Sequence, residues 1–484
     1  MRNRAIILLG ICLQSVLCMC QTVTPPPQPK LVVGIVVDQM AYEFLYRYAD
    51  KYGSTGFQRL MQEGYNCADA HYNYIPTYTG PGHASIYTGS IPAINGIVSN
   101  DWYDRNTKSY MYVTSDSTVH VVGPPSITNN MQSPANMLTT TITDMLKLSD
   151  QQRSKVIGIA LKDRGAILPA GHSADAAYWY DGYANAWVSS SYYMDTLPQW
   201  VQDVNATVPA EKYLNRNWDL FLPPTAYTNA TADSVDWETK YIGEASTKFP
   251  HYLLFQGISE IIKSTPFGNS LTEEFAEAVI RQEGMGKHSA TDFLCVSFSS
   301  TDYVGHAYGP HSVEIEDTYI RLDRDLGKFL HYLDEQVGKG NYVLFLTADH
   351  GVAPVPQYMQ SLQIPSGSVT AEGMLQTIKA IADRNLGADA WIEAYTNQQI
   401  YLNDSTVQAH HFTKQEVFHA MQSDLQKING VAFVLDMQHV QDATLPSLMR
   451  ETVINGIYPK RCGDIQLLFD PYWIEAYRPT GTTH

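Results

Sequence analysis

The chain has 484 residues, enough to bury a large core, with room for two or three domains or for one large domain with insertions. Hydrophobic residues make up 44% of it and charged residues 17%, an ordinary globular composition. The net charge of -17, from 49 acidic and 32 basic residues, argues against a protein that binds nucleic acid through a broad basic surface. A negatively charged ligand would therefore have to be attracted locally.

Residues 1–20 have the three parts of a cleavable secretory signal. Two arginines precede an apolar run at 5–17, and the small side chains Cys18 and Cys20 follow. The run is too short to span a bilayer, and no other stretch of the sequence is long and apolar enough to do so. We expect a periplasmic or secreted protein. A lipid anchor on one of the two cysteines is the less favoured alternative, because a bulky residue precedes each of them.

A run of β-branched and apolar residues at 31–37 begins the folded part of the chain, after a proline-rich stretch at 21–30 that we expect to be an extended spacer. Such a run is typical of a strand buried on both faces, and a helical pattern follows it. Short apolar runs that end in polar residues recur at 155–161, 293–298 and 342–347. Strands that alternate with helices predict an α/β fold with a mostly parallel, doubly wound sheet, covered by helices on both faces.

Residues 166–290 interrupt this alternation, because they are rich in Tyr, Trp, Ser and Asn. We expect them to form an inserted, cap-like region over the carboxyl edge of the sheet, so that the catalytic core comprises residues 31–165 and 291–484. Their aromatic side chains either line a substrate mouth or fill the core of a small subdomain, and the second use is the commoner one. The section at 357–460 has helical patterns and few residues typical of a site.

Three cysteines lie beyond the signal, and no two of them have the close spacing of a CxxC motif. An odd number at such spacings predicts neither a disulfide framework nor a zinc site built from thiolates, although one disulfide among them stays open. They are Cys67, Cys295 and Cys462.

Polar side chains follow each of the four predicted strands. In an open parallel sheet these positions share one edge, where ligands bind. The aspartates and histidines among them are oxygen and nitrogen donors that suit zinc. Each has an ordinary alternative as a turn, cap or surface residue, but the agreement of four strand ends favours a metal site. The residues are Asp38, Lys162, Asp163, Arg164, Asp302, His306, Asp349 and His350.

A Gly/Pro-rich loop within residues 71–89 leads directly into a short predicted helix. Thr79 would lie at the N-terminus of that helix, where unpaired N–H groups and the helix dipole favour an anion such as phosphate. The alternative is an ordinary N-cap threonine, since Ser, Thr, Asp and Asn are the usual caps. The polar strand ends elsewhere in the chain favour the anion site.

Taken together, these motifs resemble the signature segments of the alkaline phosphatase superfamily. More narrowly, Lys162-x-Arg164 combined with Asn100 is similar to the phosphate-irrepressible (PafA-type) alkaline phosphatases. The resemblance extends over the mature chain from about residue 31 to residue 484, and its motifs are specific in combination. They are Val36-Val37-Asp38, Thr79-Gly-Pro-Gly-His83, Asn100-Asp-Trp, Asp302-x-x-Gly-His306 and Thr-Ala-Asp349-His350-Gly351.

The resemblance implies two zinc ions and a nucleophilic threonine, Thr79, that forms a phosphothreonine intermediate. His484 is the candidate for the sixth ligand, because it is the only histidine after His439. As the last residue, it needs contacts that hold it in place. His83 and His311 are expected to be bystanders. The implied ligands are Asp38, Asp349 and His350 for one zinc, and Asp302, His306 and His484 for the other.

By the same resemblance, Asn100, Lys162 and Arg164 would bind the non-bridging oxygens of phosphate. A monoester dianion presents three such oxygens with about two negative charges, whereas a diester presents two with one charge, so an ammonium plus a guanidinium favour the monoester. Lys162 would take the place that a magnesium-bound region has in other alkaline phosphatases, so no third metal is expected. Asp163 would be structural.

The expected protein is a secreted zinc-dependent alkaline phosphatase, a monomer that hydrolyses small-molecule phosphate monoesters. The alternative within the superfamily is a phosphodiesterase or nucleotide pyrophosphatase, whose pattern lacks the Lys-x-Arg pair. A sulfatase is disfavoured because Thr79 cannot be oxidised to an aldehyde, and a cofactor-independent phosphoglycerate mutase would use serine in the cytosol. From another class, a secreted protein could capture phosphate esters without turnover, and intact Thr79 argues against it.

Overall fold

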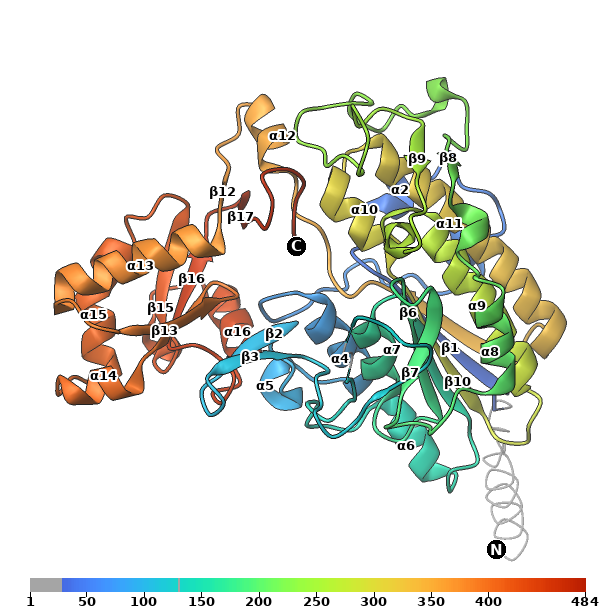
Figure 1. Cartoon of the computed structure of the whole chain (residues 1–484), viewed down its shortest axis with the longest axis horizontal. Helices are drawn as coiled ribbons and strands as arrows, with labels where there is room; N and C mark the ends of the chain where they lie inside the picture. The colour runs from blue at the N-terminus through green and yellow to red at the C-terminus, as the bar shows by residue number, and fades with distance from the viewer. Residues whose placement is uncertain (1–27, 129–130) are drawn as a thin grey trace, which may run out of the picture.

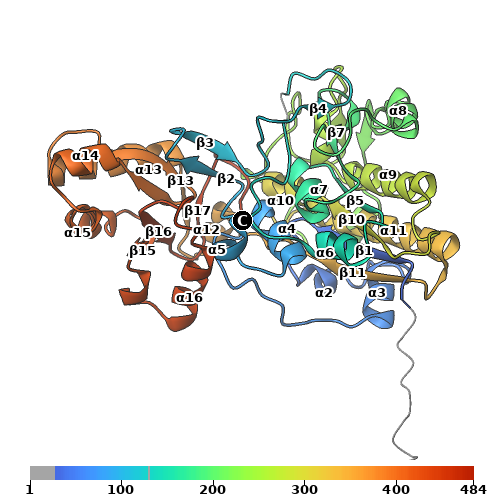
Figure 2. The same cartoon turned by 90° about the horizontal axis from the view of Figure 1, so that it is seen from below.

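A large α/β core with a smaller lobe beside it makes up the computed structural model, which describes residues 28–128 and 131–484 (Figures 1 and 2). The signal predicted at 1–20 and most of the spacer predicted at 21–30 lie outside the described residues. Within the described ranges, no helix is both long and apolar enough to cross a membrane.

The centre of the core is a seven-stranded sheet with the strand order β11-β1-β10-β5-β6-β7-β4. The strands from β11 to β6 run parallel, and β7 and β4 are added as antiparallel pairs at one edge. The predicted mostly parallel sheet is thus confirmed. Its strands are β1 (Leu31–Val37), β4 (Val121–Val122), β5 (Val156–Ala160), β6 (Ala176–Asp181), β7 (Ala186–Ser190), β10 (Asp292–Phe298) and β11 (Tyr342–Thr347).

Helices cover both faces of this sheet, because alternate side chains of the central strands point into different apolar clusters. In β1, Val33 and Ile35 pack with α9 and α11, whereas Val36 packs with Tyr87 of α4. The doubly wound arrangement is therefore confirmed as well. One face carries α2 (Phe44–Arg47), α3 (Phe57–Glu63), α9 (Phe267–Glu283) and α11 (Val313–Leu333), and the other carries α4 (Thr79–Thr88), α6 (Ile142–Ser149) and α7 (Asp163–Ala170).

The structure differs from the insertion expected at 166–290. The strands β6 and β7 fall inside this range, yet they belong to the central sheet, and α9 covers one of its faces. Tyr178, Trp179 and Trp187 of these strands are buried, so the aromatic composition here reflects core packing. We propose that the inserted region is the stretch between β7 and α9. It holds α8 (Gln199–Ala206), η1 (Glu211–Tyr213), β8 (Arg216–Trp218), η2 (Pro224–Ala226), β9 (His251–Leu253) and η3 (Glu260–Ser264).

The second lobe has its own antiparallel sheet, in the order β13-β14-β16-β15, and its own apolar core. It lies beside the α/β core in both views (Figures 1 and 2). The sequence prediction placed this part of the chain within one core, because most of its short strands mix polar and apolar residues. The lobe contains β12 (Gly367–Val369), α13 (Ala371–Leu386), β13 (Ile392–Thr396), β14 (Gln399–Leu402), α14 (Asp404–Ala409), α15 (Lys414–Leu425), β15 (Val431–Asp436), η5 (Val440–Asp442), α16 (Ser447–Gly456), β16 (Ile465–Phe469) and β17 (Trp473–Glu475).

A third apolar cluster joins the lobe to the core. It brings Trp102 of β2 (Asp101–Asp104) and Val113, directly after β3 (Ser109–Tyr112), together with Leu435 of the lobe. Arg105 Nη2 and Asp464 Oδ2, 2.9 Å apart, add an ion pair across the same boundary. The β2–β3 hairpin is therefore held between the two parts of the molecule.

The three cysteines form no disulfide within the described ranges. Cys67 is exposed, whereas Cys295 and Cys462 are buried. The disulfide that the sequence left open is therefore not made in this structure.

Candidate active site

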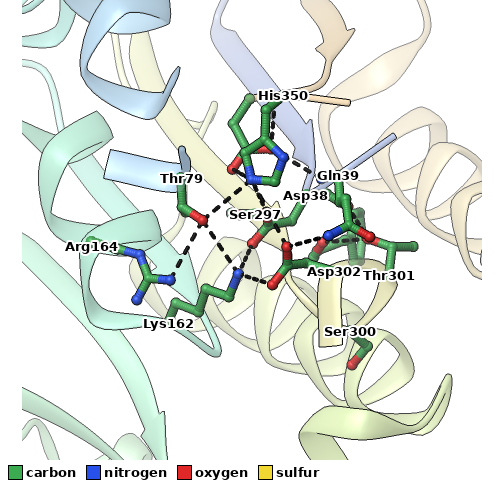
Figure 3. A network of polar contacts seen from close by, with 12 residues as sticks. Asp38, Gln39, Thr79, Lys162, Arg164, Ser297, Ser300, Thr301, Asp302 and His350 are labelled. Atoms are coloured by element: carbon green, nitrogen blue, oxygen red, sulfur yellow. Dashed lines mark hydrogen bonds and ion pairs between the residues drawn. The ribbon is translucent and has the colours of Figure 1, made fainter. Parts of the chain in front are cut away.

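The candidate site lies at the carboxyl ends of the parallel strands (Figure 3). Asp38 follows β1, Lys162 follows β5, and Asp302 lies in the first turn of α10 (Ser300–Tyr308) after β10. The three side chains are almost fully buried. Lys162 Nζ lies 2.6 Å from Asp38 Oδ2 and 2.5 Å from Asp302 Oδ2. Three strand ends that are far apart in the sequence thus meet at one ammonium group.

Two groups of three side chains at this edge could each hold a metal ion. In each group the donor atoms lie within 4.8 Å of one another, and Asp302 belongs to both. Asp349 lies beside the second group, with its Oδ2 3.6 Å from His350 Nε2. All six side chains that the sequence suggested as ligands therefore gather in one place. The groups are Asp302 with His306 and His484, and Asp38 with Asp302 and His350.

His484 is brought to the site by the last residues of the chain, which are well held. Thr482 N donates to His306 O at 2.9 Å, and Ala353 N donates to Thr483 O at 3.0 Å. The imidazole of His484 then lies 4.3 Å from the His350 ring, centroid to centroid. These backbone hydrogen bonds supply the contacts that a terminal ligand needs.

Thr79 is the first residue of α4 and is fully buried. The N-cap is Tyr78, so the hydroxyl of Thr79 does not have the ordinary capping position. Its Oγ1 lies 3.4 Å from Lys162 Nζ, 3.5 Å from Arg164 Nη2 and 3.5 Å from His350 Nε2. The hydroxyl therefore faces two cationic side chains and the candidate metal ligands at the positive end of a helix.

Two glycines let α4 come this close to the strand ends. A Cβ on Gly82 would lie 2.3 Å from Asp349 O, and a Cβ on Gly80 would lie 3.2 Å from Asn100 Oδ1. The first contact leaves no room for a side chain. The Thr-Gly-Pro-Gly sequence is thus needed for the first turn of α4 to fit between the loop after β11 and the segment that carries Asn100.

Arg164 and Asn100 complete the polar surroundings of Thr79. Arg164 Nη1 donates to the hydroxyl of Tyr112 at 2.9 Å, and this hydroxyl donates to Asp163 Oδ1 at 2.6 Å. On the other side, Gly80 N donates to Asn100 Oδ1 at 2.7 Å. The side chains that the sequence suggested for phosphate binding thus surround Thr79, and Asp163 takes part in holding one of them.

Two further residues lie at the site, although the sequence analysis gave neither of them a role there. Gln39 has a left-handed backbone, with φ of 65°. Its backbone N donates to Asp349 Oδ1 at 3.1 Å, and its side-chain Nε2 donates to Asp302 Oδ1 at 2.9 Å. His83, expected to be a bystander, has its Nδ1 2.9 Å from Thr79 O and 3.2 Å from Asp349 Oδ2. The spacing of four between Thr79 and His83 was the available signal, because it places them on one helix face.

Charges at this edge shift one another strongly. Burial and Asp349 raise the pKa of Asp38, whereas for Asp302 the neighbouring His306 and Lys162 outweigh burial and hold the pKa well below its usual range. Burial and the neighbouring His350 and His306 lower the pKa of His484, which favours the neutral imidazole that binds metals. Burial is the largest cause of the shifts at Asp38 and His484, whereas at Asp302 the neighbouring His306 and Lys162 overcome it.

Comparisons with known proteins show the family of this chain. The family model for type I phosphodiesterases and nucleotide pyrophosphatases matches residues 32–484. The alkaline phosphatase PafA of Elizabethkingia meningoseptica is 42% identical over 481 residues, which cover 99% of this chain and 88% of the relative. The crystal structure of a wild-type PafA superposes with a TM-score of 0.91 at 42% identity, covering 95% of this chain and 88% of that one. The chain belongs to the PafA-type alkaline phosphatases.

Within this branch of the alkaline phosphatase superfamily, relatives differ in name. A protein of Myroides odoratus named calcium-transporting ATPase is 45% identical over 463 residues, which cover 94% of this chain and 84% of the relative. The family model itself is named for diester and pyrophosphate hydrolysis. The kind of phosphate ester that this alkaline phosphatase prefers must therefore be argued from its own side chains.

Proposed function

We propose that this protein is a zinc-dependent phosphomonoesterase in which Thr79 is the nucleophile. The observation that carries the proposal is the position of Thr79 Oγ1, within 3.5 Å of Lys162 Nζ, Arg164 Nη2 and His350 Nε2. A hydroxyl buried at a helix N-terminus between two cations is suited to attack a bound phosphate.

The chemistry of the donor set supports zinc at this site. All six proposed ligands offer a carboxylate oxygen or an imidazole nitrogen, which zinc accepts. Asp38 and Asp349 are both fully buried, and this burial together with the negative charge of Asp349 raises the pKa of Asp38, so a cation held between the two carboxylates would be stabilised. When bound, two zinc ions would lower the pKa of the nucleophile and stabilise the leaving oxygen. The proposed sets are Asp38, Asp349 and His350, and Asp302, His306 and His484.

The side chains of the protein would carry out the attack on phosphorus and bind the phosphoryl group. Thr79 Oγ1 would give up its proton to solvent and form a bond to phosphorus. The bond from phosphorus to the ester oxygen breaks, and that oxygen takes a proton from solvent and leaves as the alcohol. Lys162, Arg164 and the amino group of Asn100 would bind the non-bridging oxygens during this transfer. Water would then attack the phosphothreonine and release inorganic phosphate, which restores the Thr79 hydroxyl. Two displacements in line give net retention at phosphorus.

The cations around Thr79 favour monoesters over diesters. A monoester carries one more negative charge and one more non-bridging oxygen than a diester, and Arg164 and Lys162 can compensate both. A phosphodiesterase of the same superfamily is the alternative, and the name of the family model gives it weight. The Lys162-x-Arg164 pair is the observation that favours the monoesterase.

Export to the periplasm or the medium belongs to the same proposal. The predicted signal lies at residues 1–20, outside the described residues. Cleavage after about residue 20 would be seen as a shortened N-terminus when the protein is purified from the periplasm or medium of an expressing bacterium. A protein that stays full-length in the cytoplasm would contradict export.

The test is paired hydrolysis of 4-nitrophenyl phosphate and bis(4-nitrophenyl) phosphate by the zinc-loaded protein at alkaline pH, with ATP as a third substrate and a chelator as control. We expect a strong preference for the monoester that the chelator abolishes and zinc restores. Preference for the diester would move the protein to the phosphodiesterase alternative. Preference for ATP would indicate an enzyme specialised for phosphoanhydrides.

Thr79→Ala separates catalysis from capture. The variant should lose hydrolysis while it still binds a phosphate analogue such as vanadate. If the zinc-loaded wild type hydrolyses none of the three substrates but binds the analogue, a binding protein without turnover would be the better description.

A further inference from the structure

Asn100 is held by hydrogen bonds to both of its oxygen atoms. Its backbone O accepts from Val113 N at 2.9 Å, and its side-chain Oδ1 accepts from Gly80 N at 2.7 Å. Within the described ranges, the amino group of its side chain has no protein partner. Because Oδ1 is fixed beside the first turn of α4, this amino group stays available to a ligand at that turn.

The second lobe binds both neighbours of Asn100 through a single side chain. Ser99 Oγ donates to Asn397 Oδ1 at 2.8 Å, and Asn397 Nδ2 donates to Asp101 O at 2.7 Å. Thr396 Oγ1 adds a donation to Asp101 Oδ1 at 3.2 Å. The amide of Asn397 thus spans the residue before Asn100 and the residue after it.

The turn that carries Asn397 is built for this contact. It joins β13 to β14, and both of its central residues have left-handed backbones, with φ of 54° at Asn397 and 61° at Gln398. Asparagine is among the few residues that accept this conformation, and it is common in such two-residue hairpin turns. Both views show β13 against the β2–β3 hairpin (Figures 1 and 2). Asn397 therefore combines the turn conformation with a side chain that reaches the other part of the molecule.

We propose that Asn397 is a positioning residue, which sets the location of Asn100 and through it the binding of the transferred phosphoryl group. The inference rests on the proposed phosphate-binding role of Asn100. It assigns the second lobe a part in catalysis, although the lobe contributes no proposed ligand or nucleophile. Small displacements of a positioning group are costly, since about 1 Å can reduce the rate about 100-fold.

The test compares Asn397→Gly with Gln398→Gly. Glycine accepts the left-handed backbone at either position, so both variants keep the turn, but only the first removes the side chain that spans Ser99 and Asp101. We expect Asn397→Gly to lower kcat/KM for 4-nitrophenyl phosphate about tenfold, and Gln398→Gly to stay within about twofold of the wild type. Asn397→Asp keeps the acceptor for Ser99 and loses the donor to Asp101, so it should be impaired as well.

A double-mutant cycle separates positioning from a general loss of structure. In the Asn100→Ala background, Asn397→Gly should have little further effect, because the group that it positions is already gone. An equal loss in both backgrounds would overturn the proposal. If Asn397→Gly does not fold, Ser99→Ala removes one of the same hydrogen bonds and decides the question by the same cycle.

The outcomes also distinguish this inference from the proposed function. If Asn100→Ala has normal activity, the phosphate-binding role of Asn100 fails and the inference loses its basis. If Asn100→Ala is impaired while Asn397→Gly behaves as the wild type, the proposed function stands and the positioning role alone is refuted.

Discussion

The guanidinium of Arg164 is oriented by a hydrogen bond to the hydroxyl group of Tyr112. Tyr112, at the end of β3, accepts from Arg164 Nη1 and donates to Asp163 Oδ1, at 2.9 Å and 2.6 Å. Arg164 is half-buried, and its Nε is buried with no hydrogen-bond partner among the described residues, so few other contacts hold the guanidinium in place. In the proposed site, Tyr112 would therefore control through Arg164 how tightly phosphate is bound.

We expect Arg164→Ala to lower kcat/KM for a monoester about 100-fold, because it removes a charged donor to a phosphate oxygen. Tyr112→Phe should cost about tenfold, the value of one hydrogen bond to a charged group. Both losses should be smaller for a diester, which lacks one of the oxygens. Steady-state kinetics with the two 4-nitrophenyl esters measure this difference. Equal losses for both esters would remove the basis for preferring a monoesterase.

Gln39 connects carboxylates that belong to different proposed metal sites. Its amide bonds Asp302, and its backbone N–H bonds Asp349. Replacement by glycine keeps the left-handed backbone and removes the first bond only. Since partners of metal ligands typically contribute about 10- to 100-fold to metal affinity, Gln39→Gly should weaken zinc binding by about tenfold or more.

Competition with a chromophoric chelator measures this effect without reference to activity. The matched control is Gln363→Gly, since Gln363 has a similar φ of 62° and is exposed. Zinc affinity at the wild-type level in Gln39→Gly would show that the ligands hold their positions without this residue.

Among the elements, α4 depends most on close packing. Gly82 lies against the backbone of Asp349, where a Cβ would approach the carbonyl oxygen to 2.3 Å. Gly82→Ala should therefore displace the helix or the loop after β11, and we expect a lower melting temperature together with reduced zinc content. Gly351→Ala is the control, because a Cβ there meets nothing within 4 Å. Similar behaviour of the two variants would show that α4 has more freedom than this contact indicates.

Elements built from local patterns could be predicted, and those built from distant contacts could not. β1 is a continuous apolar run with Asp38 directly after it, so both the strand and its polar end are visible in the sequence. β6 was not predicted as a strand of the central sheet, because its Tyr and Trp residues are also typical of the core of a small subdomain. In the structure they are buried in the sheet. In the four-stranded sheet of the second lobe, β13, β14 and β16 mix polar and apolar residues over 4 or 5 positions, which gives no clear period.

The residues of the candidate site also fall into those that a local sequence pattern predicts and those that depend on distant contacts. Asp302 and Asp349 follow strand signals, whereas His484 could be suggested only by resemblance to a family, because nothing near it in the chain indicates a ligand. Gln39 has a left-handed backbone that no local pattern encodes. Asn397 bonds a residue 298 positions away, so its role depends on how two separately packed parts of the molecule meet.

At the scale of the whole molecule, loops of the proposed inserted region are tied to α11 by a buried ionic cluster. His251 of β9 is fully buried, with its Nδ1 3.1 Å from Glu244 Oε1 and its Nε2 3.2 Å from Glu314 Oε1. Burial alone would lower the pKa of His251, but the two carboxylates outweigh it and raise the pKa to about 9. Burial and Glu314 likewise raise the pKa of Glu238 to about 8.

These shifts make the fold less stable at alkaline pH. The protonated His251 stabilises the folded state fully below its ordinary pKa of 6.5, and this contribution is lost as the pH rises through about 9. The shift corresponds to roughly 3 kcal/mol at 1.36 kcal/mol per unit. Glu238 adds to the loss up to about pH 8, because its ionised form is disfavoured in the folded protein. The enzyme would thus work at alkaline pH with a reduced margin of stability.

Urea unfolding of the zinc-loaded protein at pH 7 and pH 10 tests this. We expect the urea midpoint of the wild type to fall at the higher pH. His251→Gln should be less stable than the wild type at pH 7 but nearly equal to it at pH 10, because at pH 10 the wild type has lost the same charge. His410→Gln is the control. His410 pairs with Asp389 at 2.7 Å where both side chains are exposed, so its removal should change little at either pH. If His251→Gln keeps the full pH dependence, the loss of stability must arise in other groups, and the cluster holds the inserted region by packing alone.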